Sequence, residues 1–163
     1  MRSRIVVGGM LALGILLTPA FAADDDILAR MALCKESWAE SKSDPAKLKP
    51  FADDFRAKFA QHEHDAYFLP TANVSVLGLR VSQAYPESVG MGVGFSLTVD
   101  ATFDDARKAL EKALGKALQK CESGEGMTNC ELQIARQRTV MLMAEDKPGA
   151  KRTLIGCYYF YEK

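Results

Sequence analysis

The spacing of apolar residues along the chain changes near residue 66, from a helical period to a strand period. Before this point, apolar residues recur every three or four positions in two stretches, which is typical of one face of a helix. The first stretch is 24–39, and the second runs from Pro50 to about residue 65. Their apolar stripes are Ile27, Met31, Cys34 and Trp38, then Phe51, Phe55 and Phe59. The pattern predicts two N-terminal helices, the second of which buries three aromatic rings.

Residues 67–163 carry strand patterns on both sides of one helical stretch. Alternating apolar and polar residues predict strands at 77–82 and 89–100, and three further strands are predicted at 130–136, 139–144 and 152–161. The helix is predicted from about 102 to 120, because Thr102 can cap its first turn and Asp104 and Asp105 suit the positive end of the helix dipole. Segments 83–88 and 122–129 are predicted to be loops.

The expected order is therefore two helices followed by β-β-α-β-β-β. Short connections between strands favour antiparallel neighbours, because a parallel pair needs a long crossover. We predict a single α+β domain over 23–163, with a helical part at 24–65 and a sheet-plus-helix part at 67–163. Its mainly antiparallel sheet packs against the helices. The last strand is apolar on both faces, which predicts an interior strand with the N-terminal helices covering its second face.

The first 22 residues have the three parts of a secretory signal peptide. Arg2 and Arg4 precede an apolar run at 5–17, and Ala20-Phe21-Ala22 offers a cleavage site, with Ala23 as an alternative end. The apolar run is shorter than the ~20 residues that cross a bilayer. The sequence therefore predicts cleavage, no membrane span in the mature chain, and a periplasmic or secreted protein.

The cysteine count agrees with export. An even number of cysteines in an oxidising compartment is typical of disulfides, and the four residues are Cys34, Cys121, Cys130 and Cys157. Of the three possible pairings we favour Cys121–Cys130, because the Gly-containing segment between them can close, which leaves Cys34–Cys157. A metal site made of Cys and His is the alternative, but such sites need clustered ligands and these residues are scattered.

Charge excludes one class of partner. The 163 residues include 21 Lys and Arg against 21 Asp and Glu, and cleavage would remove two arginines. A mature chain with a small negative net charge is unsuited to binding nucleic acid through its phosphates.

Three patterns that suggest chemistry have simpler explanations. His62 and His64 could share a metal on a strand, but they fall at the expected end of the second helix, which favours an exposed helix terminus. Gly90, Gly92 and Gly94 alternate inside a predicted strand, whereas a nucleotide loop needs its glycines in a strand-to-helix turn. They favour close approach of another backbone, a ring or a partner. No nucleophile elbow occurs, so no catalytic residue, cofactor or metal is assigned.

Two predicted loops remain as candidate contact surfaces. One carries Tyr85, Pro86 and Glu87, and the other carries Glu125. Loops on a rigid scaffold lose little entropy when they bind a partner. We therefore expect an exported, non-enzymatic binding protein, such as an inhibitor or immunity-type protein that acts on an envelope enzyme, for example a cell-wall hydrolase. The alternatives are a small periplasmic hydrolase that uses carboxylates or a His62/His64 metal site, and an envelope structural or assembly factor that self-associates through the glycine-faced strand.

Overall fold

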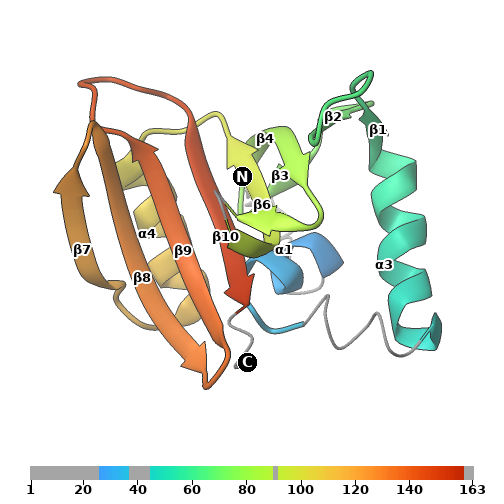
Figure 1. Cartoon of the computed structure of the whole chain (residues 1–163), viewed down its shortest axis with the longest axis horizontal. Helices are drawn as coiled ribbons and strands as arrows, with labels where there is room; N and C mark the ends of the chain where they lie inside the picture. Colours follow the sequence, from blue (N-terminus) through green and yellow to red (C-terminus); the bar gives the residue numbers. More distant parts are fainter. Residues whose placement is uncertain (1–25, 37–44, 90–91, 160–163) are drawn as a thin grey trace, which may run out of the picture.

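A computed structural model describes residues 26–36, 45–89 and 92–159 of the chain. The signal peptide predicted at 1–22 lies outside these residues. The fold is a mainly antiparallel sheet with a few helices and two disulfides, as predicted for an α+β protein (Figure 1). The sheet order is β1-β2-β4-β6-β10-β9-β8-β7, with β3 paired to β4 and β5 paired to β6.

The elements follow one another in a single run along the chain. They are α1 (Ile27–Ala32), α3 (Pro45–Lys58), β1 (Phe59–Gln61), β2 (Phe68–Pro70), β3 (Ser75–Val76), β4 (Leu79–Tyr85), β5 (Ser88–Val89), β6 (Gly92–Val99), α4 (Phe103–Leu114), β7 (Gln119–Gly124), β8 (Met127–Ala135), β9 (Arg138–Glu145) and β10 (Thr153–Tyr159).

The core lies between one face of the sheet and the helices. β10 is an interior strand between β6 and β9, as predicted, and its Ile155 and Cys157 join the same buried cluster as residues of α1 and α4. Figure 1 shows both helices behind the sheet. The expectation that an N-terminal helix covers the second face of β10 is therefore wrong for α1, because the Cys34–Cys157 disulfide ties it to the same face as α4.

The two N-terminal helices differ from their expected bounds. The Asp26 side chain caps α1 by accepting from Leu28 N at 2.8 Å, and Cys34, with φ 58°, lies just beyond the end of this short helix. The second helix, α3, begins at Pro45 rather than Pro50, and it ends at Lys58, where β1 begins. The three phenylalanines are buried as predicted, although Phe59 belongs to the strand.

Tight turns divide segments that the alternating pattern had joined. Leu77 and Gly78 have φ of 56° and 77° and form the β3–β4 turn, so 77–82 is not one strand. Val89 pairs with Gly92, which makes β5 and β6 a hairpin rather than one strand over 89–100. The segment 122–129, predicted as a loop, forms the β7–β8 hairpin with its turn at Glu125 and Gly126.

The long helix, α4, has the expected beginning and an earlier end. The Thr102 side chain accepts from Asp105 N at 3.2 Å, which confirms the predicted cap. Gly115 then takes a left-handed conformation with φ 64°, so the helix ends at Leu114 rather than near 120. Because the helix ends early, residues 119–124 can form β7, the edge strand next to β8.

Both predicted disulfides are present. Cys34 is bonded to Cys157, with 5.0 Å between their Cα atoms, and Cys121 is bonded to Cys130, with 4.1 Å. The first bond fixes α1 to the interior strand β10, and the second fixes the edge strand β7 to β8. No helix of the described residues is both long and apolar enough to cross a bilayer.

Candidate functional site

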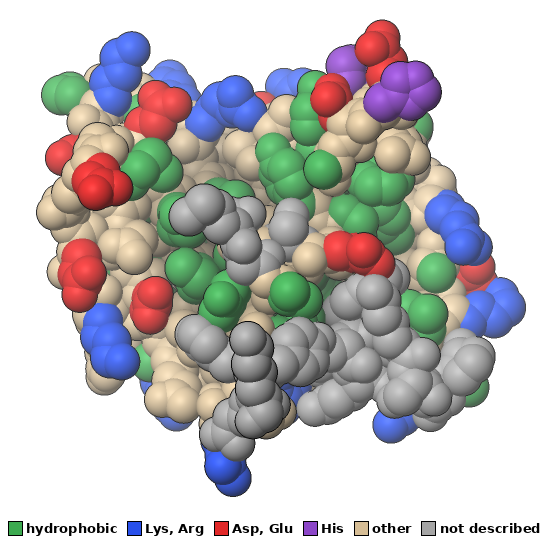
Figure 2. All heavy atoms as spheres, in the orientation of Figure 1, with side chains coloured by type: hydrophobic (Ala, Val, Ile, Leu, Met, Phe, Trp, Pro, Cys, Tyr) green, Lys and Arg blue, Asp and Glu red, His purple; other side chains and the backbone are tan. Residues whose placement is uncertain are grey.

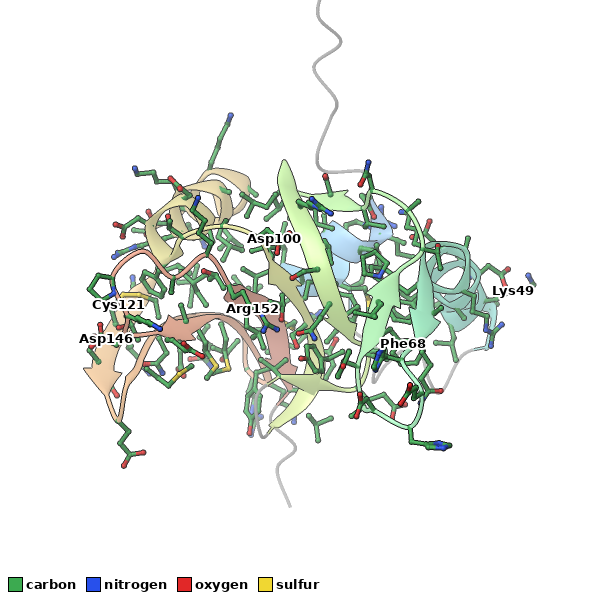
Figure 3. All side chains as sticks on the ribbon, turned by 90° about the horizontal axis from the view of Figure 1, so that it is seen from above. Lys49, Phe68, Asp100, Cys121, Asp146 and Arg152 are labelled. Atoms are coloured by element: carbon green, nitrogen blue, oxygen red, sulfur yellow. A yellow bond between two sulfur atoms is a disulfide. The ribbon has the colours of Figure 1, made fainter. Side chains whose placement is uncertain are left out.

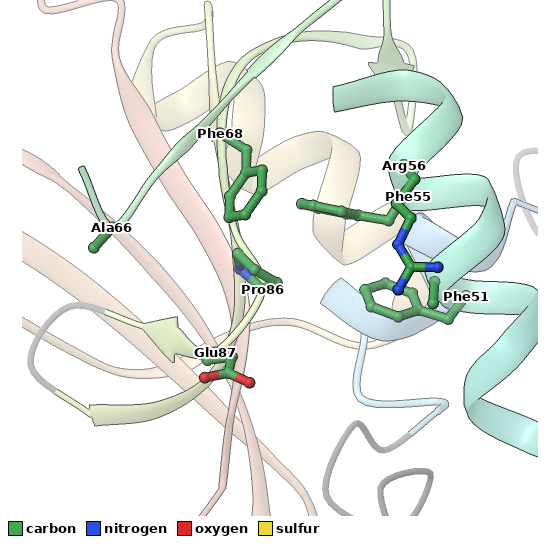
Figure 4. A pocket seen from close by; sticks show the side chains of 8 residues that line it. Phe51, Phe55, Arg56, Ala66, Phe68, Pro86 and Glu87 are labelled. Carbon is green, nitrogen blue, oxygen red and sulfur yellow. The ribbon is translucent and has the colours of Figure 1, made fainter. Parts of the chain in front are cut away.

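A mainly apolar groove of about 480 Å³ lies between α3 and the strands β2, β4 and β5 (Figure 4). Its floor and walls come from three separate parts of the chain. The lining residues are Phe51, Ala52, Phe55, Arg56, Ala66, Phe68, Pro86 and Glu87.

Ring contacts fix the aromatic floor of the groove. Phe51 and Phe55 are four residues apart on α3, so their side chains lie on the same helix face. Phe55 meets Phe68 of β2 edge to face, with ring centroids 5.1 Å apart, and Phe51 meets Phe95 of β6 in the same way at 5.5 Å. Because these rings also pack in the core, the floor exists before any ligand arrives.

Pro86 and Glu87 form the wall opposite α3. They follow the last residue of β4 and precede β5, and the Glu87 carbonyl accepts from Gly94 N at 3.3 Å. The proline ring restricts the backbone at this bend. This short segment is therefore held by strand pairing on both sides, while the Glu87 side chain is exposed.

The groove carries one cation and one anion at its rim. Arg56 projects from α3, and Figure 4 shows its guanidinium on one wall and the Glu87 carboxylate on the other. The acidic residues of α3 are paired with other partners, since Asp53 contacts Lys49 and Asp54 contacts Lys58. Within the described part of the chain, Arg56 therefore has no ion pair on its own helix.

Tyr85 does not share the groove with its two neighbours. Its hydroxyl donates to Gln83 Oε1 at 3.1 Å, and Arg152 donates to the same oxygen at 2.5 Å. Its ring lies beside Tyr67, with centroids 6.2 Å apart. The candidate loop of Tyr85, Pro86 and Glu87 is thus divided between two surfaces, and only the last two residues line the groove.

Glu125 lies far from this site in the sheet. It is exposed at the β7–β8 turn, and Gly126 accepts there from Asp146 N at 2.7 Å. Figure 3 labels Asp146 and Cys121 at one side of the molecule and Phe68 and Lys49 at the other. The structure therefore does not bring Glu125 together with Pro86 and Glu87.

The two histidines lie at the β1–β2 turn, not at a helix end as predicted. Figure 2 shows both side chains at the surface. His62 Nδ1 lies 2.9 Å from Asp65 Oδ2 and 3.1 Å from the Tyr67 hydroxyl, and its ring stacks on Tyr67. The hydrogen bond from His62, followed by that from Tyr67, lowers the pKa of Asp65, and the bond to Asp65 raises the pKa of Tyr67.

These groups form a local polar cluster that orders the turn beside the groove. Among residues 26–36, 45–89 and 92–159, no three His, Cys, Asp or Glu side chains are grouped so that they could hold a metal ion.

Gly94 has the close-packing role that its strand position suggested. A Cβ atom built there would lie 2.1 Å from the Cys157 carbonyl oxygen and 2.6 Å from Val89 Cγ2. The space beside Gly94 is therefore filled by this chain's own β10 and β5. Gly90 lies outside the described residues.

Sequence reasoning missed most of the groove. Phe51 and Phe55 have core spacing, and they are core residues as well as groove floor. Arg56 follows them as an ordinary surface residue of a helix, and Phe68 lies in a short strand that the pattern did not predict. Only the Pro86-Glu87 pair, between two recognisable strands, carried a signal.

The comparisons with known proteins add no family or function. No protein-family model matches the chain, and neither a curated protein nor a solved structure matches it. Its function is therefore inferred from the geometry of the groove.

Proposed function

We propose that this protein is an exported, non-enzymatic binding protein that inhibits an envelope enzyme, such as a cell-wall hydrolase, and that it contacts this enzyme through the groove. The observation that carries the proposal is the preformed apolar groove with Pro86 and Glu87 as one wall and an aromatic floor. Grooves of this kind accept buried anchor side chains, which supply most of the binding energy at protein interfaces.

The size and rigidity of the groove suit such an anchor. Its volume of about 480 Å³ falls within the range of roughly 300–1,000 Å³ that is usual for binding pockets. Phe51 and Phe55 are held by rings of other elements, and Glu87 is held between paired strands. A surface that is already ordered loses little conformational entropy on binding.

The compartment is part of the same proposal. The pattern of residues 1–22 is that of a signal peptide, and two disulfides are typical of proteins in oxidising compartments. We propose the bacterial periplasm, or secretion, as the place where the protein meets its partner.

A variant that fills the groove tests the proposal. Ala66 is exposed and lines the groove, so Ala66→Trp adds an indole there without removing a core contact. Ala57, exposed on α3 and not part of the lining, provides the matched control Ala57→Trp. Tagged wild type and both variants are used to capture proteins from an envelope extract of the source organism. Each captured enzyme is then assayed on its substrate with increasing amounts of the protein.

We expect the wild type and Ala57→Trp to retain one enzyme and to abolish its activity at a stoichiometric ratio, and Ala66→Trp to do neither. Retention of the same enzyme by Ala66→Trp would show that the groove is not the contact. A retained enzyme that keeps its activity would contradict inhibition. Hydrolysis of peptidoglycan by the protein alone would favour the hydrolase alternative.

A further inference from the structure

We infer that the groove binds a segment of the partner protein in which one apolar side chain lies between an acidic residue that pairs with Arg56 and a basic residue that pairs with Glu87. This inference rests on the proposed function and specifies the chemistry of its contact. It follows from the opposite charges on the two walls and the apolar floor between them.

The floor sets the apolar part of the segment. Phe55 and Phe68 on the floor, and Pro86 on the adjoining wall, offer ring surfaces without hydrogen-bonding groups, so a polar side chain placed there would lose its water without gaining a partner. An aromatic or large aliphatic side chain gains from the same burial. Aromatic anchors also pack edge to face on phenylalanine rings, which is the arrangement that Phe55 and Phe68 already show.

The charges on the two walls determine which charged residues of the bound segment flank its apolar side chain. Arg56 can pair with a carboxylate on the α3 side, and Glu87 with an ammonium or guanidinium group on the other side. Both residues are exposed, so each pair is weakened by water and contributes more to selectivity and orientation than to total affinity.

The pair of charges favours a protein segment over a small amphiphile. A lipid-like molecule with a single acidic group can pair with Arg56 but leaves Glu87 facing its apolar part. A segment of chain can carry both complementary charges at the two sides of one anchor. Because the two walls differ in shape as well as charge, such a segment binds in one direction.

Short synthetic peptides test the direction and the charges. The probes are acetylated, amidated pentapeptides with a Leu-Trp-Leu centre. One has Asp first and Lys last, one has the reverse order, and one has Asn and Gln in place of the charged residues. Binding to the intact protein is measured at low salt by titration calorimetry and by backbone amide shifts in an NMR spectrum. The shifts locate the bound peptide.

We expect shifts of the backbone amides at Phe51–Arg56, Ala66–Phe68 and Glu87, and a preference of the wild type for one of the two charged orders. Each exposed ion pair changes affinity about 1.5- to fivefold, so the preferred peptide binds roughly 2- to 25-fold more tightly than the neutral one. Increasing the salt concentration reduces this difference.

Charge reversal gives the decisive comparison. In the Arg56→Glu, Glu87→Lys double variant we expect the preferred peptide order to reverse. The matched control, Glu125→Lys with Lys147→Glu, makes the same charge changes at exposed positions next to the Asp146–Gly126 hydrogen bond, on the side of the molecule away from Phe68, and leaves the preference unchanged. If the double variant does not fold, Arg56→Gln at its exposed helix position still reduces the affinity for the charged peptide and not for the neutral one.

Three results would overturn the inference: equal affinity of the wild type for all three peptides, an unchanged preference in the double variant, or no binding at millimolar peptide. Equal affinities combined with loss of all binding in Ala66→Trp would leave the groove as a contact surface and remove only the role of the charges. Failure of the proposed function is seen separately, in the enzyme capture and inhibition assay.

Discussion

The two disulfides should differ strongly in what they contribute to stability. Cys34–Cys157 joins residues 123 positions apart, whereas Cys121–Cys130 joins residues 9 positions apart. We predict that replacing Cys34 and Cys157 by Ala destabilises the protein much more than replacing Cys121 and Cys130 by Ala.

The expected magnitudes follow from the loop that each bond closes in the unfolded chain. In the chain-entropy model the long loop contributes about 4.9 kcal/mol and the short loop about 2.7 kcal/mol to the free energy of unfolding. Burial increases the difference. Cys34 and Cys157 are 1% and 0% exposed, so both alanines leave unfilled space in the core, whereas in the second pair only Cys130 is buried and Cys121 is exposed on the edge strand.

Local structure adds to the effect at the long-range bond. α1 has only six residues, which is too short for a stable isolated helix, so its attachment to β10 depends on this bond and on burial. One further link is the hydrogen bond that Arg138 Nη1 donates to the Cys34 carbonyl at 3.1 Å. Loss of the disulfide should therefore also expose α1 amides to solvent exchange, while β7–β10 keep their protection.

Urea unfolding followed by circular dichroism measures both double variants against the wild type, with hydrogen exchange to locate the change. For a chain of this size each kcal/mol lowers the melting temperature by roughly 3 °C, so we expect thermal unfolding to show losses of about 15 °C and about 8 °C. Equal destabilisation of the Cys121, Cys130 variant and the Cys34, Cys157 variant would contradict this prediction.

Three smaller perturbations test other parts of the fold. Thr102→Ala removes the α4 cap and should cost about 1 kcal/mol in urea unfolding, whereas Thr102→Ser should cost little. Gly156→Ala would place Cβ 2.5 Å from the Phe95 carbonyl oxygen, so we expect a loss of roughly 2 kcal/mol or more. Asp65→Asn should lower thermal stability at neutral pH. Because the pKa of Asp65 is lowered in the folded protein, its contribution is present above about pH 4 and disappears as the pH falls further, so the melting temperatures of Asp65→Asn and wild type should converge in acid.

Local signals in the sequence identified the elements whose bounds depend on neighbouring residues. The Thr102 cap and the acidic first turn placed the start of α4, and the predicted strands 139–144 and 152–161 correspond to β9 and β10. The cysteine pairing was also accessible, because the short separation of Cys121 and Cys130 left one partner for Cys34. The helix cap acts over a few neighbouring residues, and the second cysteine pair followed by elimination once the first was assigned.

Turns were the main source of error, because a hairpin preserves the alternation that defines a strand. Leu77 and Gly78 continue the apolar pattern although the chain reverses there, and Val89 and Gly92 pair with each other although both lie in one alternating run. At the end of α4 the apolar stripe continues past Gly115, whose left-handed backbone stops the helix. Periodicity measures which face a side chain occupies and is insensitive to a reversal of direction.

The groove could not be predicted, because its residues meet only through tertiary packing. Phe51 and Phe55 come from α3, Phe68 from β2 and Pro86 from the end of β4. The contact between Phe55 and Phe68 depends on β2 pairing with β4, and a strand of three residues gives almost no periodic signal.

The same rings hold α3 against the sheet and form the floor of the groove, so stability and binding cannot be separated by removing them. Truncating Phe55 would break its contacts with Phe59 and Phe68 as well as the floor, and a loss of binding in that variant would not distinguish a missing contact from a displaced helix. Filling the groove at Ala66 or recharging its rim at Arg56 leaves these ring contacts in place. Changes in affinity at these two positions therefore report on the groove itself, and unchanged unfolding curves for the same variants show that α3 has kept its position.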